Sequence, residues 1–334
     1  MAITRLSDVI VPEIFFGYIQ EMSTQANRLV MSGAVASDAA LTSGLAGGGK
    51  TFNVTGWKSI SDSANDYNVS SDNPASSATA NNVQTSQQIA ARLDRNAVFG
   101  SADLAAHLAG ADPMASAASE LGNYQSTQRT KTLINILTGT FAAASMSAAR
   151  NDIAIADGAA ATTANLISND SIIDTLAPFD DMQGLGNILF VHGDVYRALQ
   201  KNNLITFEAS SAQNIGFGTY LGLTLVVDSA CPKVAGGTSG FKYTSYIMKP
   251  GAVGFGAGMP RIPVEVERRS REGNGGGVEY LTVRDAYAYH PYGMKWVGTP
   301  SGSTPSNSEL AVGTNWLRVY AQKNVGLSAL ITNG

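Results

Sequence analysis

Residues 112–141, DPMASAASELGNYQSTQRTKTLINILTGTF, carry the clearest helix signal in the chain. Asp112 is a favourable N-cap residue, and Pro113 takes the first helical position, where its missing N–H removes no hydrogen bond. Apolar residues recur on one face of this predicted helix; they are Met114, Ala117, Leu121, Tyr124, Ile134, Leu137 and Phe141. A helix over residues 113–138 would be about 39 Å long, so we predict a structural spine.

The two segments before this helix offer little core of their own. Residues 1–50 predict an N-terminal arm, in which a helix with one apolar face begins at Pro12 and the small, flexible stretch AVASDAALTSGLAGGG follows Gly33. Residues 51–100 predict two strands, TFNVTGW and IAARLDRNAVFG, around a tip rich in Ser and Asn. A two-stranded ribbon is marginal alone, so we expect it to pack on a neighbour.

The composition also indicates a protein that is covered by partners. Only 14% of the 334 residues are charged, against about 25% in ordinary soluble domains. The net charge of −4 argues against a grip on free nucleic acid. Cys231 alone cannot form an intrachain disulfide, which fits a reducing cytoplasm. No apolar stretch is long enough to span a membrane.

Residues 44–51, GLAGGGKT, match the phosphate-binding pattern G-x-x-x-x-G-K-[ST] at every fixed position. LTLVVD at 223–228 resembles the strand that ends in a magnesium-binding Asp in NTPases. A phosphate loop, however, needs a buried strand before it and a helix after it. AVASDAALTS is not a buried strand and FNVTGW is a poor helix, so we expect a glycine-rich hinge in which Lys50 binds no nucleotide. A P-loop NTPase remains the remote alternative.

No other pattern predicts catalysis, a cofactor or a metal. His107, His192 and His290 lie far apart without metal-ligand spacing, so we expect structural or surface roles. Asp180 and Asp181 are adjacent, which is no acid/base spacing, and we expect them to face solvent or cap a turn. We therefore predict that the protein is not an enzyme.

Charged residues gather on one predicted strand, IPVEVERRSR. Glu265 and Glu267 fall on one face of it, and Arg268, Arg269 and Arg271 stand close by. A catalytic carboxylate pair is an alternative, but salt bridges within or between subunits explain the pattern better. We take Glu265, Glu267, Arg268 and Arg269 as candidate inter-subunit contacts.

Beyond residue 150 the sequence mixes helices and strands, and strands dominate after Tyr243, so the fold class is α+β. Several segments, taken in their order along the chain, resemble one family, the major capsid proteins of tailed bacteriophages with the Hong Kong 97-like fold. LSDVIVPEIFFGYIQEMSTQANRLVMSG resembles its N-terminal arm, and SADLAAHLAGADPMASAASELGNYQSTQRTKTLINILTGTF its spine helix. LFVHGDVYRALQKNNLI and TYLGLTLVVDSACP resemble its axial domain. GAVGFG, VEVERRSR and HPYGMKW resemble the strands of its peripheral domain.

The resemblance implies a division into an arm (1–50), an extended loop (51–100), a spine helix (101–149), an axial domain (150–242) and peripheral-domain strands with the C-terminus (243–334). It implies hexamers and pentamers that close an icosahedral shell around double-stranded DNA, which meets the inner face without sequence-specific binding. We expect assembly in the host cytoplasm, a portal and, because the arm begins close to Met1, a separate scaffolding protein. The resemblance leaves room for a decoration protein and implies no membrane and no cofactor. An encapsulin, a shell of the same fold that stores enzymes, is the alternative.

Aromatic side chains are the predicted anchors between subunits; they are Phe15, Phe16, Tyr18 and Trp57. Some relatives link subunits covalently between a Lys of the extended loop and an Asn of the peripheral domain. Lys58 lies in the loop region, and Asn315 and Asn324 lie near the C-terminus, but no matching motif surrounds them. We therefore expect Lys58 to be solvated or ion-paired at an inter-subunit contact.

Overall fold

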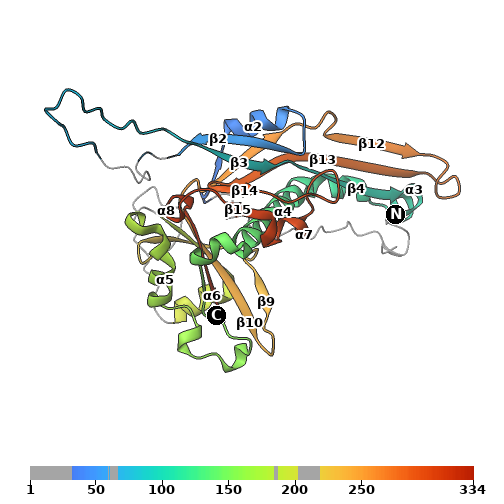
Figure 1. Ribbon diagram of the computed structural model, residues 1–334. Coiled ribbons are helices and arrows are strands. Elements are labelled where there is room, and N and C mark those ends of the chain that lie inside the picture. The colour runs from blue at the N-terminus through green and yellow to red at the C-terminus, as the bar shows by residue number, and fades with distance from the viewer. Residues whose placement is uncertain (1–31, 59, 61–66, 184–186, 202–218) are drawn as a thin grey trace, which may run out of the picture.

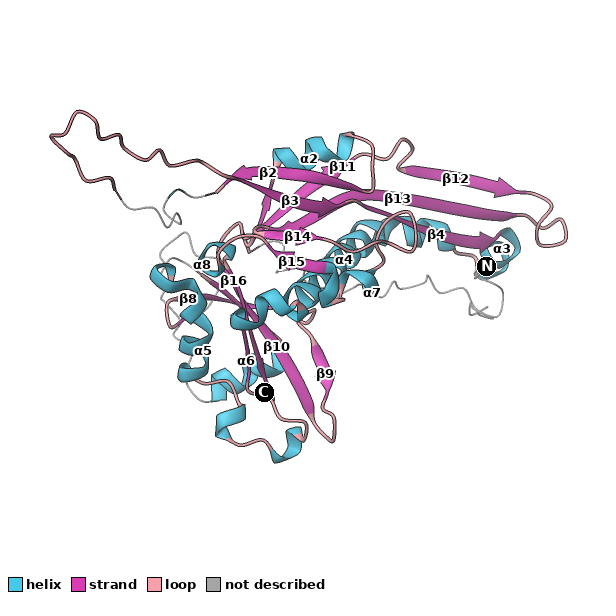
Figure 2. Cartoon of the chain, in the orientation of Figure 1, coloured by secondary structure: helices cyan, strands magenta, loops and turns pink. Residues whose placement is uncertain are grey.

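The computed structural model describes residues 32–58, 60, 67–183, 187–201 and 219–334, which form two lobes set at an angle (Figure 1). One lobe contains a five-stranded sheet and the long helix α4, and the other contains a seven-stranded sheet. Two projections leave the first lobe in opposite directions, one beyond β2 and β3 and the other at β12 (Figure 2). Both projections present surface that lies far from the core.

The five-stranded sheet is organised around β13 (Val278–Pro291), whose β-branched and aromatic residues suit a central strand. β4 (Leu93–Ala102) pairs antiparallel along one edge of β13. β12 (Val264–Arg269) and β11 (Val253–Gly258) pair in succession along the other edge, and β1 (Val35–Ser37) adds to β11 in parallel. β12 therefore has a partner on one edge only within the described chain.

The predicted long helix is confirmed as α4 (Pro113–Ala142), which extends four residues beyond the predicted end. Asp112 caps it as expected, because its side chain accepts a hydrogen bond from the Met114 N–H at 2.9 Å. The short helix α3 (Asp103–Ala109) precedes it and ends at Gly110, whose positive φ of 66° suits glycine.

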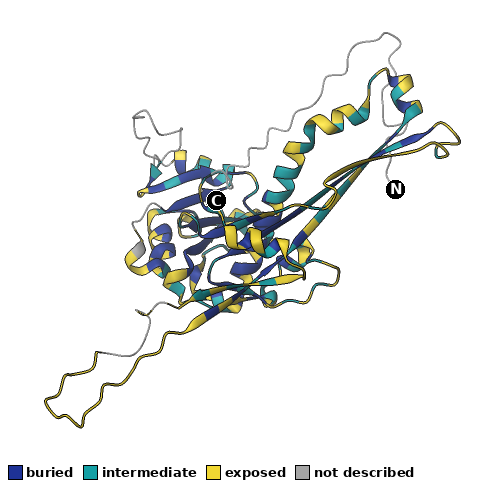
Figure 3. Ribbon diagram, turned by 90° about the horizontal axis from the view of Figure 1, so that it is seen from above, coloured by how far each residue is buried: buried dark blue, intermediate teal, exposed yellow. Residues whose placement is uncertain are grey.

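The two halves of α4 differ in burial. Nine residues between Thr130 and Phe141 are buried, whereas none of residues 113–129 is (Figure 3). Only the second part of the predicted apolar face, Ile134, Leu137 and Phe141, lies in the core. In the first half, Tyr124 contacts Phe99 of β4 edge-on, with ring centroids 5.5 Å apart, and remains 39% exposed.

The seven-stranded sheet has the order β5–β16–β10–β6–β8–β7, and β9 pairs with the remaining part of β10. Its strands are β5 (Arg150–Asp152), β6 (Ile188–Val191), β7 (Thr219–Tyr220), β8 (Leu223–Val227), β9 (Lys233–Ala235), β10 (Phe241–Met248) and β16 (Leu327–Thr332). The sheet thus combines strands from 150–242 and 243–334, which the sequence-based division kept apart. The reason is that β10 pairs with β6 on one side and with β16 on the other.

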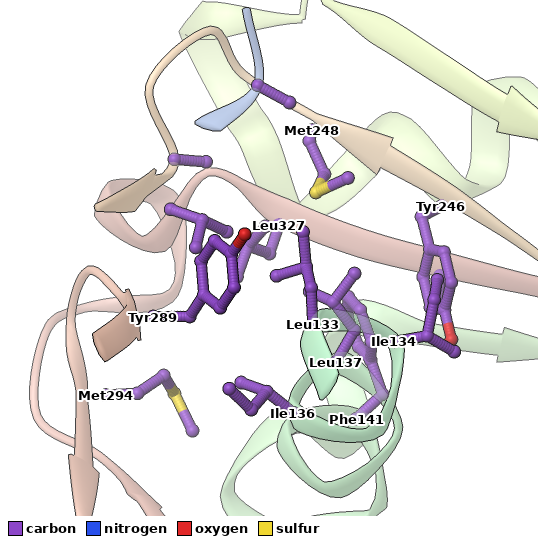
Figure 4. Packing of buried hydrophobic residues seen from close by; sticks show 14 of the residues in the cluster. Leu133, Ile134, Ile136, Leu137, Phe141, Tyr246, Met248, Tyr289, Met294 and Leu327 are labelled. Atoms are coloured by element: carbon purple, nitrogen blue, oxygen red, sulfur yellow. The ribbon is translucent and has the colours of Figure 1, made fainter. Parts of the chain in front are cut away.

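A shared hydrophobic core joins the lobes (Figure 4). The buried half of α4 contributes Leu133, Leu137 and Phe141, and the ring of Phe141 stacks on that of Tyr246 from β10, with centroids 5.6 Å apart. A second cluster fills the lower lobe between its sheet and the helices α5 (Asn169–Leu176) and α6 (Gly193–Lys201).

Shorter elements complete the described chain. β14 (Met294–Trp296) pairs with β15 (Trp316–Arg318), and the rings of Trp296 and Trp316 meet edge-on in the core. The remaining helices are α7 (Asn307–Leu310) and α8 (Gln322–Val325), with 3₁₀ turns at Ala144–Ala149, Gly158–Ala160, Thr163–Asn165, Ala177–Met182 and Gly313–Asn315. Among the described residues, no helix combines the length and the apolar character needed to cross a membrane.

The prediction of a flexible stretch before residue 50 is wrong in part. It contains β1 and the helix α2 (Ala39–Ala46), which Asp38 caps by accepting a hydrogen bond from the Ala40 N–H at 2.7 Å. Leu41 and Leu45 are buried, and Gly254 and Gly256 of β11 leave the space that Leu41 fills. Small residues in the sequence therefore indicated close packing here, not flexibility.

Candidate inter-subunit surfaces

The glycine-rich residues 44–51 do not form a phosphate loop. α2 ends within them, at Ala46, and β2 (Thr51–Trp57) begins with their last residue, which reverses the strand–loop–helix order that such a loop needs. The Lys50 ammonium donates to the carbonyl oxygen of Gly302 at 3.0 Å. Asp228 lies in the other lobe, where its side chain accepts a hydrogen bond from the Ala230 N–H at 2.9 Å. The segment thus matches the sequence pattern of a phosphate loop but does not have the geometry of one.

The predicted ribbon is a hairpin of β2 and β3 (Thr85–Ala91), followed directly by β4. We call residues 58–84, which join β2 to β3, the extension. Every described residue of the extension is exposed, and Val69 is 94% exposed. At its base Trp57 is 71% exposed, and the Lys58 ammonium donates to Gln84 Oε1 at 3.3 Å. Trp57 and Lys58 are thus both exposed in the single subunit.

The root of the extension is fixed by a buried polar cluster around Gln88 of β3, which the sequence did not reveal. We call Gln88, His290, Gly293 and Tyr320 the Gln88 cluster. The Gln88 side chain donates to the Tyr320 hydroxyl at 2.8 Å, and its Oε1 accepts from the Gly293 N–H at 2.7 Å. Nε2 of His290 lies 3.0 Å from the same oxygen. Two segments of the chain, the end of β13 with the turn after it and the segment around Tyr320, are therefore tied to the hairpin that carries the extension.

Burial controls the charge of this cluster. His290 is fully buried, and desolvation lowers its pKa from a usual value near 6.5 to about 4, against a smaller opposing effect of Asp38. The hydrogen bond from Tyr292 lowers the pKa of Asp38, which keeps that carboxylate ionised. His290 is neutral at pH 7 and serves a structural role, as expected from its isolated position in the sequence.

The second projection carries the predicted charged strand. All residues from 261 to 270 are exposed, including Val264 and Val266 of β12. Glu265 pairs with Arg284 at 2.7 Å, Glu267 pairs with Arg269 at 2.8 Å, and Arg268 pairs with Asp103 at the start of α3. The predicted salt-bridged strand is therefore present within the subunit, and contacts of these residues with a neighbour stay a prediction.

The remaining candidates lie apart from one another. His107 is exposed on α3, and His192 Nδ1 accepts a hydrogen bond from the Asp194 N–H at 3.1 Å. Asp180 and Asp181 are both exposed. Within the described ranges, no group of three or more His, Cys, Asp and Glu side chains could hold a metal ion. Phe15, Phe16 and Tyr18 lie outside the described residues.

Comparison with known proteins identifies the family. No family model matches the chain. The major capsid protein of Bacillus phage SPP1 is 31% identical over 331 residues, which are 97% of each protein. The chain belongs to the major capsid proteins of bacteriophages. As a capsid protein it is a structural component of the virion.

Solved structures confirm the fold of this capsid subunit. The capsid of Ralstonia phage GP4 matches with a TM-score of 0.63 at 8% identity, over 96% of this chain and 95% of that one. The holo-SrpI encapsulin complex from Synechococcus elongatus PCC 7942 matches with a TM-score of 0.52 at 10% identity, over 100% and 96%. The predicted α+β, Hong Kong 97-like fold is thus confirmed. Phage capsids and encapsulins share it, so the choice of a phage capsid protein rests on the relative from phage SPP1.

Proposed function

We propose that this capsid subunit forms hexamers and pentamers that close an icosahedral shell around double-stranded phage DNA. The exposure of the extension carries the proposal. Ordering each backbone residue costs about 1–2 kcal/mol, and the described residues of the extension are all exposed, so they bury too little within their own subunit to offset this. Contact with a neighbouring subunit would supply that burial.

The same reasoning assigns roles to the rest of the chain. Aromatic side chains contribute large contact areas, so we place Phe15, Phe16 and Tyr18 of the arm, together with Trp57, against neighbouring subunits. We propose the second projection, with Glu265, Glu267, Arg268 and Arg269, as a further contact region. The five-segment division into arm, extended loop, spine helix, axial domain and peripheral strands is retained as a proposal.

Assembly needs further partners. We propose a separate scaffolding protein and a portal, with a decoration protein as an optional addition, and assembly in the host cytoplasm. We propose that packaged DNA meets the inner face without sequence-specific binding, because the net charge of −4 argues against a strong grip on DNA phosphates. We propose no catalytic activity and no cofactor, because the glycine-rich segment has the wrong neighbours for a phosphate loop.

Shortening the extension tests the proposal. A variant in which a short Gly/Ser turn replaces residues 59–83 should leave a folded, soluble subunit or capsomer that no longer closes shells. The matched control keeps the full length and changes Ser76 and Ser77, both exposed, to Ala. Sedimentation and negative-stain microscopy, with the scaffold co-expressed, would compare the two. Shells of normal yield from the shortened protein would refute the role of the extension, and an unfolded product would assign it to the subunit core.

A further inference from the structure

A pocket between α4 and β4 has no role in the fold described so far. It is lined by Arg95, Asn96, Ala97, Tyr124, Gln125, Gln128, Thr132, Val283, Asp285, Tyr287 and Asn307. Along α4 it runs from Tyr124 to the buried Thr132, and it lies next to the edge of the five-stranded sheet. Four of its polar side chains are amides, which can donate hydrogen bonds; they are Asn96, Gln125, Gln128 and Asn307.

The pocket has one positive charge in excess. Arg129 binds Asp285 through two parallel hydrogen bonds, both 2.7 Å long, so the charge of this carboxylate is already neutralised. Arg95 stands directly opposite Asp285 in the pairing of β4 with β13. Its guanidinium donates only to neutral oxygens, namely the backbone carbonyls of Asp94 and Pro305 and the side-chain oxygens of Thr304 and Asn307. Among the described residues no carboxylate lies within ion-pair distance of it.

These observations define the chemistry of the occupant. A half-buried guanidinium beside amide donors recognises a carboxylate, because a charge-assisted hydrogen bond is stronger than one between neutral groups. Tyr124, partly exposed at the rim, offers an aromatic surface beside it.

The extension carries a carboxylate of the required kind. The sequence of the extension has three acidic residues, Asp62, Asp66 and Asp72. Of these, Asp72 lies in the described part of the extension, where it is exposed and no cation of the described chain lies within ion-pair distance of it. The backbone between Lys58 and Asp72 can span up to about 46 Å, so the tip can reach well beyond its own subunit (Figure 1). We propose that the pocket beside Arg95 binds the Asp72 carboxylate of a neighbouring copy. This inference rests on the proposed function of the extension as a contact between subunits.

Disulfide trapping tests the proposal directly. Gln125 lines the pocket, so the proposed contact should bring residue 72 of one subunit next to residue 125 of another. A disulfide needs Cα atoms within about 7 Å, and cysteines at these two positions should therefore link subunits covalently in assembled shells. The native Cys231 is buried and should not interfere. The matched control pairs a cysteine at Asp72 with one at the exposed Asn123, two residues away on a different face of α4. Non-reducing gels should show loss of the monomer band for the first pair only.

Charge reversal provides a second test that needs no cross-link. Gln128→Glu places a carboxylate of nearly the same shape in the pocket, where it should compete with Asp72 for Arg95 and lower the denaturant concentration at which shells dissociate. Adding Asp72→Lys should restore that midpoint, because the new Lys can pair with the new Glu. Normal shells with no trapped disulfide and no effect of Gln128→Glu would overturn the proposal while leaving the role of the extension intact. Failure of the wild-type chain to form shells would instead count against the proposed function itself.

Discussion

Gly122 and Gly139 belong to the same helix, α4, and lie in opposite surroundings. A methyl group added at Gly122 would meet nothing within 4 Å, whereas one added at Gly139 would lie 2.0 Å from the Leu310 carbonyl oxygen and 2.7 Å from Trp316 Nε1. The backbone is helical at both positions, and the Asp112 cap with Pro113 favours the helix at its exposed start. Only the second half is also held by the subunit's own core.

The same contrast separates the body of the subunit from its projections. Buried side chains of the body determine the free energy of unfolding. The described residues of the extension and those of β12 are exposed, and the first half of α4 (113–129), which we call its bare half, contains only exposed and partly buried residues. Substitutions in the body should therefore change unfolding, and substitutions in the projections should change assembly. The following predictions are ordered by their expected effect on the free energy of unfolding.

The largest effect is expected from Leu137→Ala. Leu137 is fully buried in the core shared by the lobes, and removing such a side chain costs about 2–5 kcal/mol because it leaves a cavity. Leu121→Ala, in the bare half of the same helix, should cost less than about 1 kcal/mol. Urea unfolding of the unassembled subunit would measure both. Equal losses would show that the halves of α4 do not differ as their burial suggests.

Acid should weaken the body through His290. Because the pKa of this ring is about 4 in the folded protein and near 6.5 when unfolded, the unfolded state binds the proton first as the pH falls. Stability should be fully present above pH 6.5 and fall by about 3 kcal/mol in total down to pH 4. Unfolding measured from pH 7.5 to 4 should show this loss in the wild type.

The control for His290 is a neutral side chain of similar reach. His290→Gln retains a group that can donate to Gln88 and carries no titrating ring. The stability that this variant loses between pH 6.5 and 4 should therefore be about 3 kcal/mol smaller than the loss in the wild type. An identical pH dependence in both proteins would assign the acid sensitivity to other groups.

Gly139→Ala should destabilise the subunit by about 1–3 kcal/mol, because backbone and a packed Trp ring must move to admit one methyl group. Gly122→Ala should instead stabilise it by about 0.5–1 kcal/mol, since alanine favours an exposed helix interior. Thermal unfolding of the two variants compares one substitution in two surroundings. A destabilising Gly122→Ala would mean that the first half of α4 is packed in the isolated subunit.

The sequence predicted local features of this molecule well. Asp112, Pro113 and the apolar spacing up to Phe141 determine α4 through contacts between near neighbours in the chain, so the helix could be located and its end placed within four residues. The strand TFNVTGW was found for the same reason. The order of such segments then led to the capsid family, which the relative from phage SPP1 confirms.

Features that depend on distant segments were missed. Gln88 and His290 are 202 residues apart, and nothing near either residue indicates that they share a buried hydrogen bond. The pocket beside Arg95 likewise takes its lining residues from β4, α4, β13 and α7. α2 was overlooked because its small residues resemble a linker until β11, two hundred residues later, provides the surface that buries Leu41.

Trp57→Ala should separate assembly from folding. Trp57 is largely exposed at the end of β2, so its loss should change the free energy of unfolding by less than about 0.5 kcal/mol. If a neighbour covers the ring, each contact loses about 1.5–3 kcal/mol, and shells should form poorly. Thr55→Ala, at an exposed position of the same strand, is the control. Normal shells from Trp57→Ala, measured by sedimentation, would remove this residue from the contacts between subunits.

The smallest effect is expected from Lys50→Ala. The Lys50 ammonium makes one exposed hydrogen bond, to the Gly302 carbonyl oxygen, and exposed interactions of this kind contribute less than about 0.5 kcal/mol. The helix before the glycine-rich segment and the strand after it leave no helix N-terminus to face a phosphate. Titration with ATP and Mg²⁺ should therefore give no saturable binding to the wild type or the variant, and both should assemble alike. Saturable binding that disappears in Lys50→Ala would show that this segment, despite its reversed order of helix and strand, holds nucleotide.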